Sequence, residues 1–359
     1  MRIATYTTHD IMSLKTTYGM KDYWEEMGHE VFPYIISCNP VDVFAFNTKH
    51  YQMYSNALDH AEKVRADVIF FDNLLNVPEY LLAELEVRPE YKPKVIFMFA
   101  YRESYKAESR AKVLSRLVDM PQVKFALIES AIGPDIMPPK NANIYGLGTR
   151  KCKIIYDRIN EDPSEFKRDK IKSRMNYGLP LEAFILLFFG RLTYSKGIDV
   201  LAKAMEKLGS EVFLFMSAHN RSSSPLDFDF DPHKVFDSMR NVKFMEGVVP
   251  NDKLGEVYSA CDAAVIPYRW TYTYGTSGIP FQAAMANRPF ISPDIYPISE
   301  FTTKYKLGPI FKSEDVDSLV EAIRFTKNNY KHIIKNAQFE DFIAHTTTIK
   351  QMAELVVSE

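Results

Sequence analysis

The sequence predicts an α/β protein of two domains, and three observations carry this prediction. Short runs rich in β-branched and aromatic residues alternate with longer stretches of Glu, Lys, Leu and Ala, which is typical of β-α-β units with parallel sheets. The length of 359 residues exceeds the roughly 100 to 200 residues of an ordinary domain. A densely charged segment, residues 150–175, interrupts the alternation. We therefore predict the domain boundary there, with domains at 1–160 and 161–335 and a C-terminal helical segment at 336–359.

The elements follow in order from the two periodicities. In the first half we expect strands at 2–8, 31–37, 67–72, 94–100 and 123–130, and helices at 13–27, 50–65, 78–87 and 104–118. Gly28 suits the end of the first of these helices, because the next strand begins at once. In the second half we expect strands at 183–190, 211–218, 242–248, 263–268, 288–293 and 308–311, and helices at 197–208, 251–260, 278–287 and 314–328. Residues 222–233, rich in Ser, Pro and Asp, are expected to form a surface loop.

Composition narrows the class of protein. The 44 Lys and Arg residues nearly balance the 46 Asp and Glu residues, which argues against a nucleic-acid partner. Cys38, Cys152 and Cys261 lack the spacing of a metal site or of a disulfide framework, so a reducing compartment is favoured. The longest apolar run, 183–189, is far shorter than the ~20 residues of a membrane-spanning helix, and the N-terminus does not resemble a signal peptide. We expect a cytoplasmic protein and leave peripheral contact with the inner face of a membrane open.

The strongest chemical signal is the segment 188–205, FFGRLTYSKGIDVLAKAM. An apolar strand runs through Gly190 into a turn that presents Arg191 and Lys196, and a helix follows from Gly197. A helix N-terminus offers unpaired N–H groups and a positive dipole end, so two cations beside it suit the diphosphate of a nucleotide. The alternative is a surface turn whose cations face water.

A second turn of the same kind lies at 272–287, after the strand 263–268. Thr276 or Ser277 is expected to cap the following helix, and Gly278 allows close approach of the backbone to a ligand. Ligands of parallel α/β sheets bind beyond the carboxyl ends of the strands, so the two turns can converge on one site. Alone, this turn is uninformative, since every α/β protein needs capped helices.

At this point the chain resembles the family 4 glycosyltransferases of the GT-B type (glycosyl transferases group 1). The motifs that carry the resemblance occur in order as GRLTYSKGID (190–199), then residues 241–268, 277–294 and 298–323. The resemblance implies two Rossmann-like, doubly wound domains facing a cleft, with the acceptor on the N-terminal domain and a UDP- or GDP-linked sugar on the C-terminal one. It also implies transfer with retention of configuration, no metal, no other cofactor, and a C-terminal helix that packs back toward the first domain.

The resemblance further implies roles for individual residues. Arg191 and Lys196 would be catalytic, since they would bind the donor diphosphate and stabilise the charge that grows as the sugar bond breaks. The residues implied to bind the donor are Gly190, Gly197, Val248, Val249, Arg269, Thr276, Ser277, Gly278 and Glu300. The residues implied on the acceptor side are His9, Tyr101, Arg102 and Glu103. A strand end for the two valines, and a solvent-facing loop for Glu300 and the acceptor-side residues, are the alternatives.

The chain departs from the commonest pattern of this family at two positions. Many members carry a pair of glutamates that holds the donor, and the matching residues here are Gly275 and Ala283. The chain is instead similar to variants with Pro267-Tyr268-Arg269 before the second turn, so recognition of hydroxyls would fall to Thr276, Ser277 and backbone amides, with Arg269 nearby. These two positions keep open the alternative of a catalytically silent nucleotide-sugar-binding protein. A nucleotide-sugar epimerase of related fold and a DNA-base glucosyltransferase are further alternatives. The acceptor is unidentified and could be a saccharide, a lipid-linked molecule or another small molecule.

Overall fold

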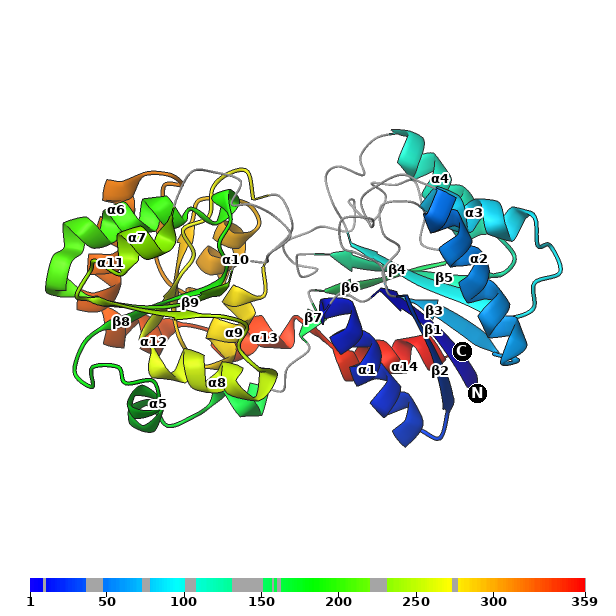
Figure 1. Cartoon of the computed structure of the whole chain (residues 1–359), viewed down its shortest axis with the longest axis horizontal. Coiled ribbons are helices and arrows are strands. Elements are labelled where there is room, and N and C mark those ends of the chain that lie inside the picture. Colours follow the sequence, from blue (N-terminus) through cyan, green and yellow to red (C-terminus); the bar gives the residue numbers. More distant parts are fainter. Residues whose placement is uncertain are drawn as a thin grey trace. The chain divides into compact units, whose positions relative to one another are not determined.

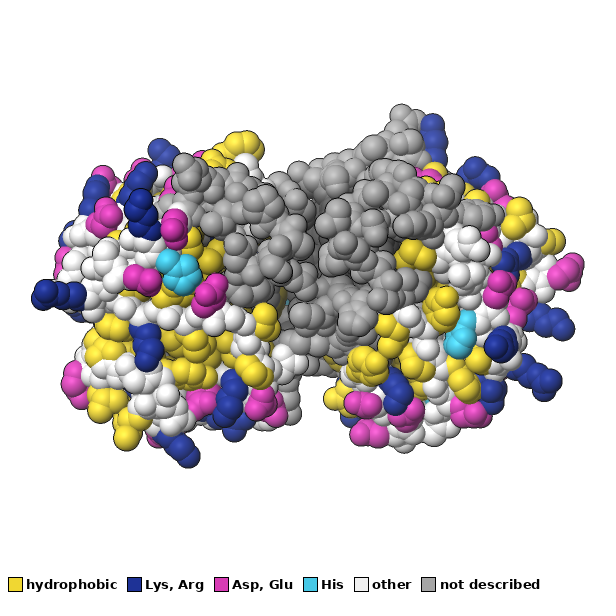
Figure 2. All heavy atoms as spheres, viewed as in Figure 1, with side chains coloured by type: hydrophobic (Ala, Val, Ile, Leu, Met, Phe, Trp, Pro, Cys, Tyr) yellow, Lys and Arg dark blue, Asp and Glu magenta, His cyan; other side chains and the backbone are white. Residues whose placement is uncertain are grey.

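The chain divides into two compact units (Figure 1), which are described separately. The first comprises Met1–Asn160 and Thr346–Glu359, and the second Glu161–His345. This is a computed structural model, in which the described residues are 1–8, 11–36, 48–72, 78–100, 108–130, 151–156, 158–159, 163–219, 231–272 and 277–358. Lys, Arg, Asp and Glu side chains are interspersed on the face of each unit shown in Figure 2.

The first unit is built on a parallel six-stranded sheet of order β2-β1-β3-β4-β5-β6. Its strands are β1 (Arg2–Thr8), β2 (Glu30–Ile36), β3 (Val68–Phe71), β4 (Lys94–Ala100), β5 (Val123–Ser130) and β6 (Cys152–Tyr156). The connecting helices are α1 (Ile11–Glu26), α2 (Thr48–Lys63), α3 (Pro78–Glu86) and α4 (Glu108–Asp119). Alternate strand residues feed two apolar layers: Ala4 and Tyr6 pack with α2, α3 and α4, while Ile3 packs with α1 on the other face.

The charged segment 150–175, predicted to hold the domain boundary, contains elements that the sequence did not predict, among them a strand and the start of a helix. Strand β6 pairs with β5 in parallel, and helix α5 (Lys170–Asn176) lies in the second unit. An edge strand has only one neighbouring strand and tolerates charged residues, so its hydrophobic pattern is weak. The break between the units therefore falls at Asn160, after the last strand of the first sheet.

The C-terminal helix α14 (Ile349–Val357) completes the first unit. Thr348 and Gln351 form a capping box at its start, and the indole Nε1 of Trp24 in α1 donates a hydrogen bond of 2.9 Å to the carbonyl oxygen of Ala353. Just before it, β14 (Thr347–Thr348) pairs in parallel with β7 (Arg158–Ile159). The predicted segment 336–359 is thus divided, because its residues up to His345 belong to the second unit.

The second unit has a parallel sheet of order β10-β9-β8-β11-β12-β13. Its strands are β8 (Ile185–Arg191), β9 (Phe213–His219), β10 (Val242–Glu246), β11 (Ala263–Val265), β12 (Phe290–Pro293) and β13 (Ile310–Phe311). Its helices include α6 (Ile198–Leu208), α7 (Pro232–Phe236), α8 (Asn251–Ala260), α9 (Ile279–Met285), α10 (Ile298–Lys304), α11 (Val316–Asn328), α12 (Tyr330–Asn336) and α13 (Phe339–Ala344). The chain builds outward from β8 in one direction and from β11 in the other, so the carboxyl ends of these two neighbours form the switch point where such sheets bind ligands.

A buried ion-pair network fixes the beginning of β8 beside β11. The carboxylate of Asp262 accepts hydrogen bonds of 2.7 Å from the Ile185 amide and from Nη2 of Arg174, and a further one from Lys170. Asp262 and Arg174 are both buried. Because Asp262 immediately precedes β11, this network holds the two central strands together at the end opposite the switch point.

Among the described residues, no helix is long and apolar enough to cross a membrane.

Candidate functional site

The turn after β8 is shaped by two glycines in left-handed backbone conformations. Gly190 has a φ of 124° and Gly197 a φ of 62°. Between them lie the exposed Arg191 and a single 3₁₀ turn, Tyr194–Lys196, and α6 begins directly after Gly197. A Cβ on Gly197 would lie 1.8 Å from the carbonyl oxygen of Pro267, so only glycine lets this turn approach the segment after β11 so closely.

Lys196 is a buried cation in an aromatic environment. The residue is only 8% exposed to solvent. Its ammonium nitrogen lies 3.6 Å from the ring centroid of Tyr268 and 4.2 Å from that of Tyr272. Within the described part of the chain, no carboxylate forms an ion pair with Lys196. Burial lowers the pKa of Lys196 well below its ordinary value of 10.5, and the positive charge of Arg191 lowers it further.

Tyr268 joins the two turns that the sequence singled out. Its hydroxyl lies 2.9 Å from Oγ of Ser277, while its ring faces Lys196. Ser277 has a left-handed φ of 68°, and α9 begins two residues later with Gly278 as its cap residue. The Ile279 amide lies 3.4 Å from the Ser277 hydroxyl, a weak contact in place of the expected side-chain cap. The structure therefore brings the two predicted turns together through a residue that was not predicted to touch a ligand.

Arg269 lies inside the protein, where its guanidinium already has partners. The residue is 7% exposed, and its Nη2 donates hydrogen bonds of 2.6 Å to both carboxylate oxygens of Asp199 in the first turn of α6. Nη1 donates to Glu314, and Nε donates to the carbonyl oxygen of Tyr194 at 3.1 Å. These bonds give Arg269 a structural role in the turn that carries Lys196, and a contact between Arg269 and a ligand stays a prediction.

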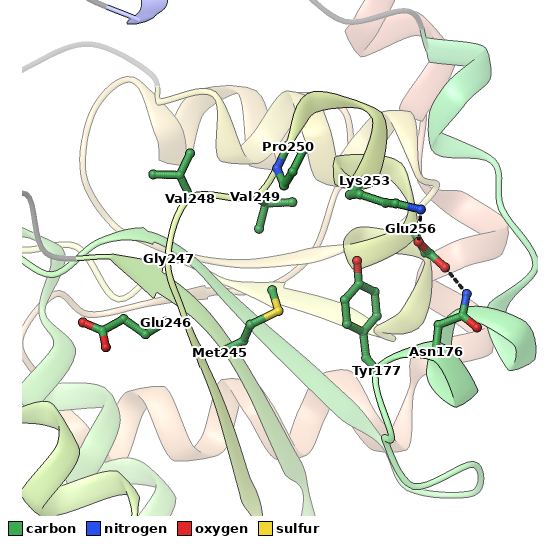
Figure 3. Close-up of a pocket in the computed structure, with 10 residues that line it drawn as sticks. All are labelled: Asn176, Tyr177, Met245, Glu246, Gly247, Val248, Val249, Pro250, Lys253 and Glu256. Carbon is green, nitrogen blue, oxygen red and sulfur yellow. Dashed lines mark hydrogen bonds and ion pairs between the residues drawn. The ribbon is translucent and has the colours of Figure 1, made fainter.

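The loop that carries Val248 and Val249, two of the residues implied to bind the donor, lines a pocket at the carboxyl end of β10 (Figure 3). The pocket has a volume of about 500 Å³, and it is bounded by Val248 and Val249 on the loop. Val248 is 63% exposed. The remaining lining residues are Asn176, Tyr177, Met245, Glu246, Gly247, Pro250, Lys253 and Glu256. Lys253, Glu256 and Asn176 form a connected polar chain at one end, as Figure 3 shows, so the pocket combines exposed apolar side chains with a polar rim.

The other residues singled out from the sequence are placed as follows. Glu300 is exposed in the first turn of α10, beyond the carboxyl end of β12. Ala283 is fully buried in α9 and offers a ligand only backbone groups. The residues that lie outside the described part of the chain are His9, Tyr101, Arg102, Glu103, Gly275 and Thr276. Of the expected surface loop 222–233, the structure describes only residues from Asp231 onward, and Asp231 caps α7 by accepting hydrogen bonds from the amides of His233 and Lys234.

Sequence reasoning missed the two tyrosines and the two carboxylates that organise the site. The sequence run YRWTYTY, residues 268–274, contains four aromatic residues shortly after β11. Such a cluster of aromatic residues could have predicted a binding site for a cation. Asp199 and Glu314 carried no such signal, because each reads as an ordinary charged residue on a helix or in a loop. They pair with Arg269 only because the folded sheet brings α6 and the segments after β11 and β13 together.

Comparison with known proteins bears on the second unit in particular. Residues 183–329 match the family model of glycosyl transferases group 1. An uncharacterized glycosyltransferase of Methanocaldococcus jannaschii is 32% identical over 136 residues, which are 35% of this chain and 32% of that protein. The teichuronic acid biosynthesis glycosyltransferase TuaC of Bacillus subtilis is 25% identical over 178 residues, which are 50% of this chain and 41% of that protein. The chain thus matches well under two thirds of the length of these curated relatives.

The fold is also that of solved glycosyltransferase structures. The Anabaena protein HepE, solved with UDP and glucose, superposes with a TM-score of 0.68 at 14% identity and covers 100% of both chains. At such low identity the likeness concerns the fold alone. Two Rossmann-like units with parallel six-stranded sheets are the GT-B architecture, as the sequence predicted.

Proposed function

We propose that this chain, whose residues 183–329 form a glycosyl transferases group 1 domain, is a retaining glycosyltransferase that uses a nucleotide-sugar donor. One observation carries the proposal: Arg191 and Lys196 stand at the switch point of a parallel sheet, without a carboxylate partner among the described residues. Two cations beside the N-terminus of α6 form a site for an anion with several phosphate oxygens.

The chemistry follows from the charge that such a transfer develops. The bond between the anomeric carbon and the diphosphate oxygen breaks, and its electron pair stays on the diphosphate. An acceptor oxygen forms the new bond to the anomeric carbon, and its proton passes to the departing diphosphate or to solvent. Arg191 and Lys196 stabilise the departing negative charge, and such electrostatic stabilisation is usually the largest catalytic contribution. Retention, implied by the family resemblance, is part of this proposal.

UDP is the nucleotide that we propose for the donor. Structures of the Anabaena protein HepE contain UDP and UDP-glucose, and that protein shares the fold of this chain. The backbone of Val248 and Val249 is placed at the carboxyl end of β10, in the same sheet as the two cations, where it offers N–H and C=O groups to a base. Ala283 offers no side-chain hydrogen bond, so recognition of the sugar is assigned to Ser277 and to backbone amides.

Thermal stabilisation by a panel of UDP, GDP, ADP and their sugars tests the donor site. A ligand that binds only the folded state raises the melting temperature in proportion to its affinity and concentration. We expect UDP and UDP-sugars to raise it for the wild type and for Lys203→Ala, which removes an exposed lysine from the same helix α6. Lys196→Ala should lose the shift. No shift for any nucleotide at millimolar concentration would sink the proposal.

A silent nucleotide-sugar-binding protein is the second candidate, and the buried Ala283 is the observation that favours it. Chromatographic assay of UDP release from UDP-sugars separates the two functions. A transferase releases UDP faster when a mixture of saccharide and lipid-linked acceptors is added. A silent protein gives binding without release, and an epimerase converts the sugar without any acceptor.

A further inference from the structure

The switch-point site contains two buried cations whose surroundings differ. Arg269 is paired with two carboxylates, those of Asp199 and Glu314. Lys196 lies against the rings of Tyr268 and Tyr272, and no carboxylate of the described residues pairs with it. Carboxylates therefore contact one cation, and aromatic rings contact the other.

This difference has an electrostatic consequence. A carboxylate would stabilise the ammonium of Lys196 but would cancel its charge and compete with an incoming anion. The face of an aromatic ring attracts a cation through its quadrupole and leaves the net charge unchanged. An ammonium held against the faces of two rings is therefore kept in place and remains attractive to a dianion.

We infer that Tyr268 and Tyr272 are positioning residues that hold the Lys196 ammonium as an uncompensated cation for a ligand's diphosphate. The identity of that ligand rests on the proposed function, but the hold on Lys196 does not. The two rings lie 4.4 Å apart by their centroids, so they form one continuous surface under the ammonium. Tyr268 is itself fixed at both ends, because its hydroxyl meets Ser277 and its carbonyl oxygen accepts a hydrogen bond of 3.0 Å from Ser313.

The charged groups around Lys196 indicate what the rings must offset. Burial opposes protonation of Lys196 most strongly and lowers its pKa, and the positive charge of Arg191, at the end of β8, adds to this effect. Asp199 of α6 is engaged with Arg269, as is Glu314 beyond β13. Tyr268 is itself buried, and that burial raises the pKa of its hydroxyl well above the ordinary value, so the ring stays neutral across the physiological range. The two ring faces are thus the described groups that favour the charged form of Lys196 by direct contact.

Paired substitutions separate the ring from the hydroxyl. Tyr272→Leu and Tyr268→Leu remove a ring face, whereas Tyr272→Phe and Tyr268→Phe keep it. Tyr258→Leu is the matched control for loss of a ring, because Tyr258 is a fully buried tyrosine of α8 whose hydroxyl bonds to Gln282. The first readout is the pH midpoint of Lys196 acetylation in the ligand-free protein, measured by mass spectrometry. The second is the affinity for UDP as a function of pH, measured by calorimetry.

We expect each Leu variant at 268 or 272 to lower the acetylation midpoint of Lys196 by roughly half to one and a half pH units, as loss of one cation–π contact predicts. The Phe variants and Tyr258→Leu should keep the wild-type midpoint within about a third of that shift. UDP affinity near neutral pH should fall about threefold to thirtyfold in the Leu variants, and less in the Phe variants. An unchanged midpoint in both Leu variants would overturn the inference, whether or not UDP binds. A lowered midpoint in a protein that binds no nucleoside diphosphate would support the inference and refute the proposed function.

Discussion

Replacement of Gly197 by alanine tests the geometry on which the whole site depends. Gly197 holds a left-handed conformation, and its Cβ would come within 1.8 Å of the Pro267 carbonyl oxygen. An ordinary contact between carbon and oxygen is about 3.3 Å, so the turn after β8 and the segment after β11 must separate by roughly 1.5 Å. The neighbour is backbone and cannot rotate away. Lys196 would move relative to Tyr268 by a comparable amount.

The magnitude has two parts, and a second glycine isolates one of them. A left-handed conformation costs a residue with a Cβ about 1–2 kcal/mol. Gly28 also has a positive φ, 81°, but a Cβ there would meet nothing within 4 Å. Gly28→Ala should therefore show the backbone strain alone. Gly197→Ala should show the same strain plus about 1–3 kcal/mol for forcing atoms into an occupied space.

The assay compares melting temperatures and UDP affinity for the two variants and the wild type. We expect Gly197→Ala to lower the melting temperature clearly more than Gly28→Ala does, and to weaken UDP binding by tenfold or more, since a misplacement near 1 Å can cost about 100-fold in activity. Gly28→Ala should bind UDP like the wild type. Equal thermal shifts for the two variants, or unchanged UDP affinity in Gly197→Ala, would refute the claim that this contact sets the position of Lys196.

Three further predictions concern the charges of the second unit. Lys196→Met should raise the free energy of unfolding at neutral pH. The wild type loses stability as the pH falls from 10.5 through the lowered pKa of Lys196, by up to about 1.4 kcal/mol per pH unit. Parallel pH profiles of the two proteins in urea unfolding would contradict this prediction. Arg174→Leu should cost about 3–5 kcal/mol by leaving the buried Asp262 carboxylate without its arginine, whereas Arg324→Ala, at an exposed pair, should leave the urea midpoint nearly unchanged. Arg269→Lys keeps the charge but loses the fork to its carboxylates, so UDP affinity should fall about tenfold while the far-UV spectrum is retained; wild-type affinity would show that this arginine does not position the turn.

The six strands of the second unit and the four helices α6, α8, α9 and α11 could be predicted from the sequence, whereas the short helices α7, α10 and α12 were not. The run at 183–190 predicted β8 with an error of two residues at its start and one at its end. The turn between this strand and the next helix was also predicted, since Gly190 and Gly197 mark it, whereas the role of Arg191 and Lys196 in binding a ligand stays a prediction. These features are local, and local patterns survive in a single sequence.

The partners of Lys196 could not be predicted in the same way. Tyr268 and Tyr272 lie more than 70 positions away in the chain, and they reach Lys196 only because β11 is the neighbour of β8 in the sheet. The residues of β11 and of the segment after it do not indicate that β11 pairs with β8 and not with β9. The two carboxylates beside Arg269 could not be predicted for the same reason, since they come from α6 and from the segment after β13. Edge strand β6 was missed for the opposite reason, because its pattern is weak although its neighbour is close in sequence.

The topology of the second sheet explains why a buried, uncompensated lysine is found there. β8 and β11 are adjacent in space but are followed by helices that leave in opposite directions, so their ends leave a crevice that side chains from both must line. Gly197 brings the two ends to backbone contact, and the contact buries Lys196 against Tyr268. Burial of a cation without a counter-ion lowers the stability of the free protein, and an anion that enters the crevice removes this destabilisation. Affinity for a diphosphate and the instability of the empty site therefore have the same cause, and a substitution that stabilises the free protein by neutralising Lys196 should weaken binding.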